Sequence, residues 1–294
     1  MLEQMKHLTY SFIIPHHNSP ELLNRCLDSI PQREDIQIII VDDNSVEEKK
    51  PQVSRTDVEI ICIDAEHTKG AGHARNVGLA KAQGKWVLFA DCDDYYVNNF
   101  IDVLDQYIEK SFDVVYFNYN FIDGETGNVF APNKLQSYLN SHDKTEEQRE
   151  FIKYQNNTPW DKLVKREYIN THNMYFEEVP NGNDVLFSLF IAYLTNNIAI
   201  ESKQLYNYIK NPNSLGTKRQ TQAELLCRID HIIRHSYFNQ HIGHTEWNAG
   251  LFHYLLSILK QYGFLTFLQL LPKAISHRFN KVFREEWVRI ISTN

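Results

Sequence analysis

The amino-acid sequence predicts an α/β fold in which helices flank a mostly parallel central sheet. Short, nearly continuous apolar segments alternate along the first half of the chain with segments of helical periodicity. The apolar segments are rich in β-branched residues and show little polar alternation, which is typical of strands buried on both faces. Most of them end in acidic or turn-forming residues, and these ends are the first candidates for a binding site.

The first half of the chain begins with a strand, a helix and two further strands. The first strand is YSFIIP (Tyr10–Pro15), and the apolar residues of the following ELLNRCLDSI (21–30) share one helical face. The segment IQIIIVDDNS (36–45) is the second strand, and VEIICID (58–64) is the third. The order strand, helix, strand is that of a sheet with crossover helices.

The stretch GAGHARNVGLAKAQG (70–84) predicts a glycine-rich start, a helix over 74–82 and a glycine stop at Gly84. It does not match a dinucleotide-binding G-x-G-x-x-G loop, because Arg75 stands where the last glycine should be. The next segment, KWVLFADCDD (85–94), predicts the fourth strand.

The second half of the chain is less regular. The sequence predicts another strand over 113–123 and a turn at GETG (124–127). The polar stretch 133–150 reads as an irregular excursion followed by a helix. Long helical periodicity dominates from about residue 220 onward.

Composition limits the kind of protein and the compartment. The 294 residues are 43% hydrophobic, which suffices for a buried core. No apolar stretch is long enough to span a membrane or to serve as a secretory signal. The four cysteines show no C-x-x-C spacing, so neither a disulfide framework nor a zinc knuckle is indicated and a reducing cytoplasm is expected.

The formal charge of −7 argues against nucleic acid as a general partner. Residues 251–294 carry six Lys or Arg against two Glu, a net +4, which leaves −11 on residues 1–250. We expect the basic tail to contact an anionic membrane surface, or else to form a helical cap on the rest of the chain or on a second subunit.

Unusual residues follow three predicted strands: Pro15–Asn18, Asp42–Ser45 and Asp91–Asp94. Ligands of such sheets bind beyond the carboxyl ends of the strands, so we expect these segments to meet at one crevice. Carboxylates at the end of a buried strand suit Mg²⁺ or Mn²⁺, which keeps other positions for phosphate oxygens. The alternative is a solvated acidic loop or a helix start, since Asp is a favoured N-cap.

Asp43 and Arg75 could each contact a nucleotide or have a purely structural role. Asp43 could accept hydrogen bonds from a base, although an Asp in VDDNS can equally close a turn. Arg75 could supply paired donors to a nucleotide, although an arginine near a helix start is often a surface residue.

Together the motifs SFIIPHHN, IIIVDDNS and GAGHARNVGLAKAQGKWVLFADCDD, in this order and spacing, resemble the nucleotide-binding half of a family-2 glycosyltransferase of GT-A fold. The resemblance covers roughly residues 10–125 and continues more loosely through TPWDKL, PNGNDVLFSLF and LYNYIKNPNSLG. It implies a nucleotide-sugar-binding half over 1–125 and an acceptor-binding half over 126–219. The remaining residues, 220–294, lie outside the resemblance, and their periodicity predicts a C-terminal helical region.

The resemblance also implies an activity, namely inverting transfer of a hexose or N-acetylhexosamine from a UDP-sugar to a saccharide hydroxyl, as in surface-polysaccharide assembly. It implies Mn²⁺ or Mg²⁺ as cofactor, and a saccharide or lipid-linked saccharide as acceptor. Such an enzyme is expected in the cytoplasm or at the inner face of its membrane. The donor-site roles that the resemblance implies fall on Pro15 and Asn18 (nucleotide), Asp43 (base), Arg75 and Asp91 (ribose and diphosphate), Asp93 (metal) and Asp94 (metal, as alternative or helper).

Inversion requires a base on the opposite face of the sugar. The family's base is an Asp usually preceded by Glu, and the matching segment PNGNDVLFSLF offers Asp184 with Asn183 in place of that Glu. Asp184 could also simply cap the helix that follows it. Trp160 in TPWDKL could offer a ring face to an acceptor sugar, or could belong to the core. The pair His16 and His17 is given no catalytic role.

Two rivals remain open from the sequence. One is a sugar-nucleotide-binding or scaffolding protein with a degenerate acceptor half, which the Asn183 departure suggests. The other is a nucleotidyltransferase, which would want a glycine-rich basic loop after the first strand, and PHHNSPELL supplies none.

Overall fold

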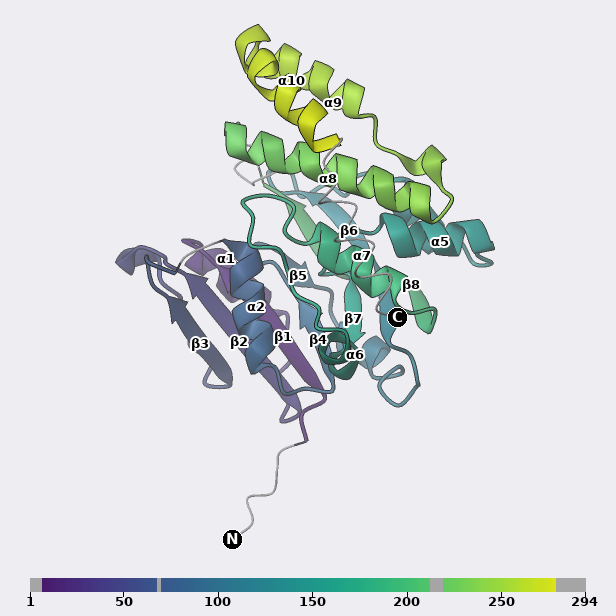
Figure 1. Ribbon diagram of the computed structural model, residues 1–294. Coiled ribbons are helices and arrows are strands. Elements are labelled where there is room, and N and C mark those ends of the chain that lie inside the picture. Colours follow the sequence, from purple (N-terminus) through teal and green to yellow (C-terminus); the bar gives the residue numbers. More distant parts are fainter. Residues whose placement is uncertain (1–6, 68–69, 212–218, 279–294) are drawn as a thin grey trace. The chain divides into compact units, whose positions relative to one another are not determined.

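The computed structural model describes residues 7–67, 70–211 and 219–278 (Figure 1). Within these residues, eight strands form one sheet in the order β3-β2-β1-β4-β7-β6-β8-β5. The strands are β1 Tyr10–His16, β2 Ile36–Asp43, β3 Val58–Ile63, β4 Trp86–Phe89, β5 Tyr95–Tyr96, β6 Val114–Asp123, β7 Lys162–Lys165 and β8 Ile198–Lys210.

Seven α-helices and one short 3₁₀ helix accompany the sheet within the described residues. They are α1 Pro20–Asp28, η1 Glu47–Lys49, α2 Ala71–Lys81, α3 Phe100–Leu104, α4 Lys134–Asn140, α5 Glu146–Gln155, α6 Arg166–Thr171 and α7 Val185–Tyr193.

Four neighbouring strands are parallel and bring their carboxyl ends to one edge. β1 pairs in parallel with both β2 and β4, and β2 pairs in parallel with β3. The other half of the sheet is mixed, because β7 runs antiparallel to β4 and β6, and β5 runs antiparallel to β8. The predicted α/β class and flanked sheet are confirmed, with the parallel part limited to β3-β2-β1-β4 and the β6–β8 pair.

The core lies on both faces of the sheet, as the continuous apolar strands require. Along β1, Phe12 packs in a cluster with the helix α1 residues Leu23 and Leu27. The next residue, Ile13, packs on the opposite face with Ala74 of α2. Figure 1 shows α2 lying across β1 and β2, which it contacts directly. The helices thereby fix the strand ends where the candidate residues lie.

Two local predictions differ from the structure. The stretch 133–150 contains two helices, α4 and α5, rather than an irregular excursion before one helix. Each begins with a capping box, made by Asn133 with Gln136 and by Thr145 with Gln148, and these boxes are the signal that the polar composition concealed. The helix predicted over 74–82 is α2, which runs from Ala71 to Lys81, so Gly84 lies beyond its end and does not stop it. Gly84 instead permits a close approach to β1, because a Cβ there would lie 2.5 Å from the backbone carbon of Tyr10.

The chain divides into two compact units. One contains 1–179 and 183–214, and the other contains 180–182 and 215–294. In the second unit the structure describes α8 Gln222–His241, the 3₁₀ helix η2 Thr245–Trp247, α9 Leu251–Tyr262 and α10 Phe264–Arg278. These helices enclose a small apolar core of their own. Among the described helices none is both long and apolar enough to cross a membrane.

Candidate active site at the carboxyl ends of the parallel strands

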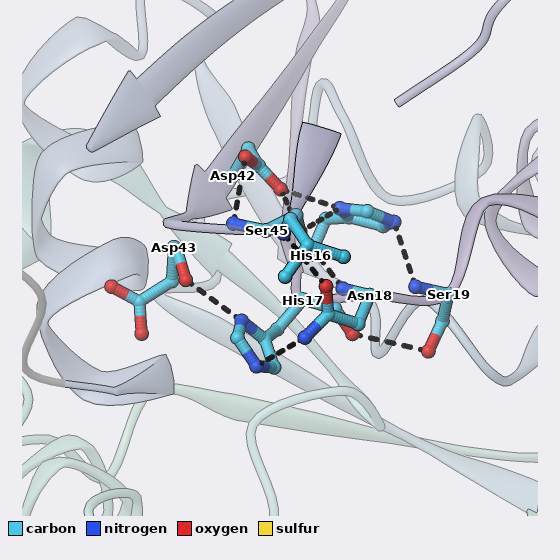
Figure 2. A network of polar contacts seen from close by, with 8 residues as sticks. His16, His17, Asn18, Ser19, Asp42, Asp43 and Ser45 are labelled. Atoms are coloured by element: carbon cyan, nitrogen blue, oxygen red, sulfur yellow. Dashed lines mark hydrogen bonds and ion pairs between the residues drawn. The ribbon is translucent and has the colours of Figure 1, made fainter. Parts of the chain in front are cut away.

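The loop after β1 is tied to the loop after β2 (Figure 2). Asn18 has a left-handed backbone with φ of 55°, which asparagine adopts more readily than most residues. Its N–H donates to Ser45 Oγ at 2.8 Å, and its Oδ1 accepts from the N–H of Val46 at 3.0 Å. Pro15 is buried near the end of β1, beyond the residues that pair with β4, where its missing N–H costs no ladder hydrogen bond.

A buried histidine, His16, binds both this loop and the turn after β2 (Figure 2). The N–H of Ser19 donates to His16 Nε2 at 3.2 Å, so Nδ1 carries the ring proton and donates to Asp42 Oδ1 at 2.7 Å. Asp42 also accepts the N–H of Ser45 at 3.2 Å, which closes the turn after β2. His16 and Asp42 are each 1% exposed, so they form internal scaffolding rather than a ligand contact.

Asp43, the neighbour of this scaffold, joins β2 to the start of α2. Its Oδ2 accepts the N–H of Gly70 at 3.0 Å, and the side chain is 8% exposed. Its backbone oxygen lies 2.8 Å from Nδ1 of the exposed His17. The predicted base contact through Asp43 stays a prediction, while its position at the strand edge is the expected one.

The three acids after β4 have three different neighbourhoods. Asp91 receives a hydrogen bond from Arg75 Nη2 at 2.5 Å, and its side chain is 30% exposed. Its own N–H donates to the hydroxyl of Tyr206 at 3.0 Å, which attaches the end of β4 to β8. A partly exposed carboxylate paired with a buried guanidinium is thus fixed at the strand edge.

Asp93 is partly buried, and its carboxylate meets a neutral donor. Asn211 Nδ2 donates to Asp93 Oδ2 at 3.0 Å, and the guanidinium of Arg25 binds the backbone oxygen. Burial and the nearby charge of Asp91 raise the pKa of Asp93 above its ordinary value. A bound cation would oppose that shift because it stabilises the charged carboxylate, so Asp93 is the acid of the three that best suits a metal.

Asp94 is the most buried of the three acids and binds the backbone of β8. It is 1% exposed, and its Oδ1 accepts the N–H of Ile209 at 2.7 Å, which anchors the turn to β8. Burial and the charges of Asp91 and Asp93 raise its pKa well above the usual range. Its other oxygen, Oδ2, is buried without a hydrogen-bond partner among the described residues. The predicted helper role of Asp94 at a metal stays a prediction. A helix does not begin here, since α3 starts only at Phe100.

The oxygen ligands that the acids after β4 offer suit a cation that also binds substrate phosphates. Within residues 7–67, 70–211 and 219–278, no three His, Cys, Asp or Glu side chains are grouped as a complete protein site. Mg²⁺ is usually held through one or two carboxylates together with substrate phosphates and water. A single carboxylate such as Asp93 at the edge of the crevice is compatible with that arrangement.

Arg75 connects the acids after β4 to the segment before α7. Both lie in the first compact unit, 1–179 and 183–214, which is called the catalytic unit from here on. Arg75 is 5% exposed, and besides Asp91 it binds Asn183 Oδ1 through Nη1 at 2.7 Å. Its guanidinium lies 5.4 Å from the centre of the Phe176 ring. Asn183 immediately precedes Asp184, so one buried cation joins the end of β4 to the segment that carries the candidate base.

The same face of α2 holds that segment at three further points. Asn76 exchanges two hydrogen bonds with the backbone of Phe176, at 2.9 and 2.8 Å. His73 Nδ1 lies 2.7 Å from Glu178 Oε1. At Gly72 a Cβ would lie 2.1 Å from the backbone oxygen of Glu177, so only glycine permits this approach. Helix α2 therefore positions the segment that leads to Asp184.

Asp184 occupies the N-cap position of α7 but makes no capping hydrogen bond with its side chain. Its backbone oxygen accepts the N–H of Ser188 at 2.9 Å. The plain alternative, a capping carboxylate, is therefore not realised. Burial lowers the pKa of Lys162, and the charges of Asp161 and Asp184 oppose this shift. The charge of Asp184 therefore acts on the buried ammonium of Lys162.

Trp160 lies in the core rather than at the crevice surface. It is 4% exposed, and its ring stacks with Tyr206 at 5.0 Å and with Tyr208 at 5.3 Å between centroids. Tyr119 meets it edge-on at 4.7 Å. The predicted sugar-stacking role does not fit this placement, because the ring is enclosed by protein.

Several contributors were not singled out as site residues from the sequence. Tyr206 and Asn211 reach the acids from β8 and from the residues after it, far away in the chain. His16 was assigned no role, yet it builds the scaffold beneath the first loop. Tyr206 and Asn211 come close to the acids because β8 pairs with β5 and β6.

The family model described as "Glycosyl transferase family 2" matches residues 11–172, more than half of the chain. The chain belongs to glycosyl transferase family 2. This match covers all of the acids after β4 and all of α2, and it confirms the predicted enzyme class.

Other proteins similar to this family-2 glycosyltransferase carry transferase names. Glycosyltransferase GlyG of Streptococcus pneumoniae is 28% identical over 70% of this chain and 72% of its own length. An Escherichia coli enzyme, UDP-Glc:alpha-D-GlcNAc-diphosphoundecaprenol beta-1,3-glucosyltransferase WfaP, is 33% identical over 37% of this chain and 44% of its own length. The chain thus spans under half of that second relative.

A solved structure shares the fold. The crystal structure of S. aureus TarS residues 1–349, in complex with UDP-GlcNAc, superimposes with a TM-score of 0.62 over 92% of this chain and 81% of that one, at 21% identity. The family match and this likeness together confirm the predicted GT-A fold.

Proposed function

We propose that this family-2 glycosyltransferase moves a hexose or N-acetylhexosamine, with inversion, from a UDP-sugar to a hydroxyl of a saccharide or lipid-linked saccharide. The observation that carries the proposal is the guanidinium of Arg75, which binds Asp91 on one side and Asn183 on the other. A donor-side acid and the segment of the candidate base are thereby held around one crevice, as a single displacement requires.

The names of similar proteins support the choice of substrates. A relative that is 33% identical is named for a UDP-Glc donor and a diphosphoundecaprenol acceptor. The TarS structure was solved with UDP-GlcNAc. We infer a donor and an acceptor of the same chemical classes here, for a step in polysaccharide assembly.

The mechanism follows from the positions of the polar groups. Asp184 accepts the proton of the acceptor hydroxyl as its oxygen forms a bond to C1 of the sugar from the face opposite the diphosphate. The bond from C1 to the diphosphate oxygen breaks, and its electron pair leaves with UDP. Asp43 accepts from the N–H of the base, while Arg75 and Asp91 order the ribose and diphosphate side.

We propose that Asp93 would hold Mn²⁺ or Mg²⁺ when the donor binds. Such a cation would supply positive charge that offsets the negative charge developing on the leaving diphosphate. Asp94 is omitted from this set because it is only 1% exposed and its Oδ1 already accepts the N–H of Ile209.

We further propose that the protein works in the cytoplasm. Cys26, Cys62 and Cys92 form no disulfide in the structure, and this supports a reducing compartment. An acceptor linked to a lipid would bring the enzyme to the inner face of the membrane.

A donor screen followed by product analysis tests the proposal. We expect UDP-sugars to raise the melting temperature more with Mn²⁺ than without it, because binding to the folded state stabilises it. Proton NMR of the product should show an anomeric configuration opposite to that of the donor. Pyrophosphate release would instead indicate a nucleotidyltransferase, and binding without transfer or slow donor hydrolysis would indicate a sugar-nucleotide-binding protein.

A further inference from the structure

Helix α10 carries apolar side chains on two opposite sides. On one side Leu270 and Ala274, each 1% exposed, pack inside the helical unit. On the other side Leu265, Leu268 and Ile275 are 77%, 44% and 52% exposed. These three lie three and seven positions apart, so they form one stripe along the helix, here called the α10 stripe. Contiguous exposed apolar side chains, unlike single ones, commonly mark an interaction site, so the stripe is expected to have a covering partner.

The charge around the stripe indicates what that partner is. No Asp or Glu occurs in residues 251–278, whereas Lys260, Lys273 and Arg278 do. Lys260 and Lys273 are both exposed. Along α9 and α10 the exposed charged side chains of the described residues are thus cations, and an apolar stripe on such a helix pair is complementary to a surface that offers acyl chains beneath phosphate groups.

We propose that the α10 stripe binds the surface of an anionic lipid bilayer. The exposed apolar side chains enter the boundary between headgroups and acyl chains, and the lysines lie against lipid phosphates. This inference stands on α9 and α10 and does not depend on the proposed transfer reaction, although a lipid-linked acceptor would give it a use.

A second copy of this chain fits the stripe less well. In a two-fold contact through α9 and α10, neither helix would offer a carboxylate to the lysines of the other copy. Juxtaposed like charges disfavour such a contact. A bilayer of anionic lipids has no such conflict.

Vesicle sedimentation of the full chain tests the proposal. We expect the protein to pellet with vesicles of phosphatidylcholine and phosphatidylglycerol in equal parts, and to stay in solution with phosphatidylcholine alone. Added salt should weaken the binding, since lysine–phosphate attraction at a surface is screened. Replacing both lysines by Lys260→Gln and Lys273→Gln should weaken partitioning roughly 25-fold, at about fivefold for each cation.

Changes in the apolar stripe separate membrane insertion from simple charge attraction. Leu265→Ser with Leu268→Ser should weaken partitioning at least roughly tenfold, because apolar area is lost from the bilayer. The matched control is Val129→Ser, which removes a 62% exposed apolar side chain from the catalytic unit and should leave partitioning unchanged.

Three results would overturn the proposal. They are failure of the unchanged chain to pellet with anionic vesicles, equal pelleting of the Leu265→Ser/Leu268→Ser variant, and a dimer in solution that the same variant converts to monomer. Should the serine variant fail to fold, the lysine variant decides, and undiminished binding by it would overturn the proposal as well.

Discussion

Asp91, Asp93 and Asp94 lie within four residues, yet their surroundings separate them. Asp91 binds Arg75, Asp93 meets the amide of Asn211, and Asp94 is enclosed against the backbone of β8. The raised pKa of Asp93 has burial as its first cause and the charge of Asp91 as its second. At the residue scale, one acidic run therefore contains an ion-pair partner, a candidate metal ligand and a structural anchor.

The candidate base gives the first prediction at this scale. Asp184→Asn keeps the size of the side chain but removes its ability to accept the acceptor's proton. We expect transfer to fall by roughly 10²- to 10⁴-fold, the usual contribution of a general base, with donor affinity unchanged. Steady-state kinetics measures the fall in transfer rate, and calorimetric titration of UDP measures the donor affinity.

The control for that variant is Asp94→Asn, which keeps a side chain able to accept from the Ile209 N–H. We expect it to retain most of the transfer activity because Asp94 contacts the fold and not the substrates. Near-normal transfer by Asp184→Asn would mean that the base lies elsewhere in the crevice.

At the scale of elements, α2 joins the two halves of the catalytic unit. Its first turns contact the segment before α7 through Gly72, His73, Arg75 and Asn76. The residues after Gly70 were expected to form a loop feeding a helix near the nucleotide. The structure adds that this helix also positions the segment of Asp184, so changes in α2 should reach the reaction without contacting a substrate.

Asn76→Ala tests this positioning. The change removes two hydrogen bonds to the backbone of Phe176 and leaves Arg75 and the acids in place. We expect kcat to fall roughly tenfold to a hundredfold, as small displacements of catalytic groups do, with the donor KM nearly constant. The control is Asn24→Ala on α1, whose side chain also binds a backbone oxygen, that of Gln52. Equal kcat values for the two variants would contradict the positioning role.

Helix α5 offers a pH-dependent prediction. Burial lowers the pKa of Lys153 to about 8, and its Nζ donates to Asn196 Oδ1 at 2.6 Å. Between this value and the ordinary 10.5, the unfolded chain binds more protons than the folded one, so the contribution of Lys153 to stability rises with pH. Relative to Lys153→Met, the unchanged protein should gain about 1 kcal/mol from pH 7 to pH 9 in urea unfolding. A constant difference between the two proteins would contradict this assignment.

Much of the catalytic unit could be predicted from local pattern. The strands β1, β2 and β4 are continuous apolar runs that end in the site residues, so their class and their shared edge follow from periodicity. The positions of Trp160 and Asp94 could not be predicted this way. Both depend on β8, whose aromatic residues and backbone N–H groups reach them across long distances in the chain.

At the scale of the whole molecule, charge is divided along the sequence. Residues 251–294 carry +4 on a chain whose total is −7. The acidic part contains the family-2 match, and the basic part contains α9 and α10 with their exposed apolar residues. We infer that the two parts have separate tasks, sugar transfer and contact with an anionic surface, and that variants of either part should leave the other task intact.

We propose that the carboxyl ends of β1, β2 and β4 bind a nucleotide diphosphate together with a cation held by Asp93. Calorimetric titration of UDP, with Mn²⁺ and with a chelator, tests it most directly. We predict that Mn²⁺ strengthens UDP binding by the unchanged protein and by Asp94→Asn, and that this gain disappears in Asp93→Ala. An Mn²⁺-dependent affinity that survives Asp93→Ala, or an affinity for UDP that ignores Mn²⁺ throughout, would contradict the account.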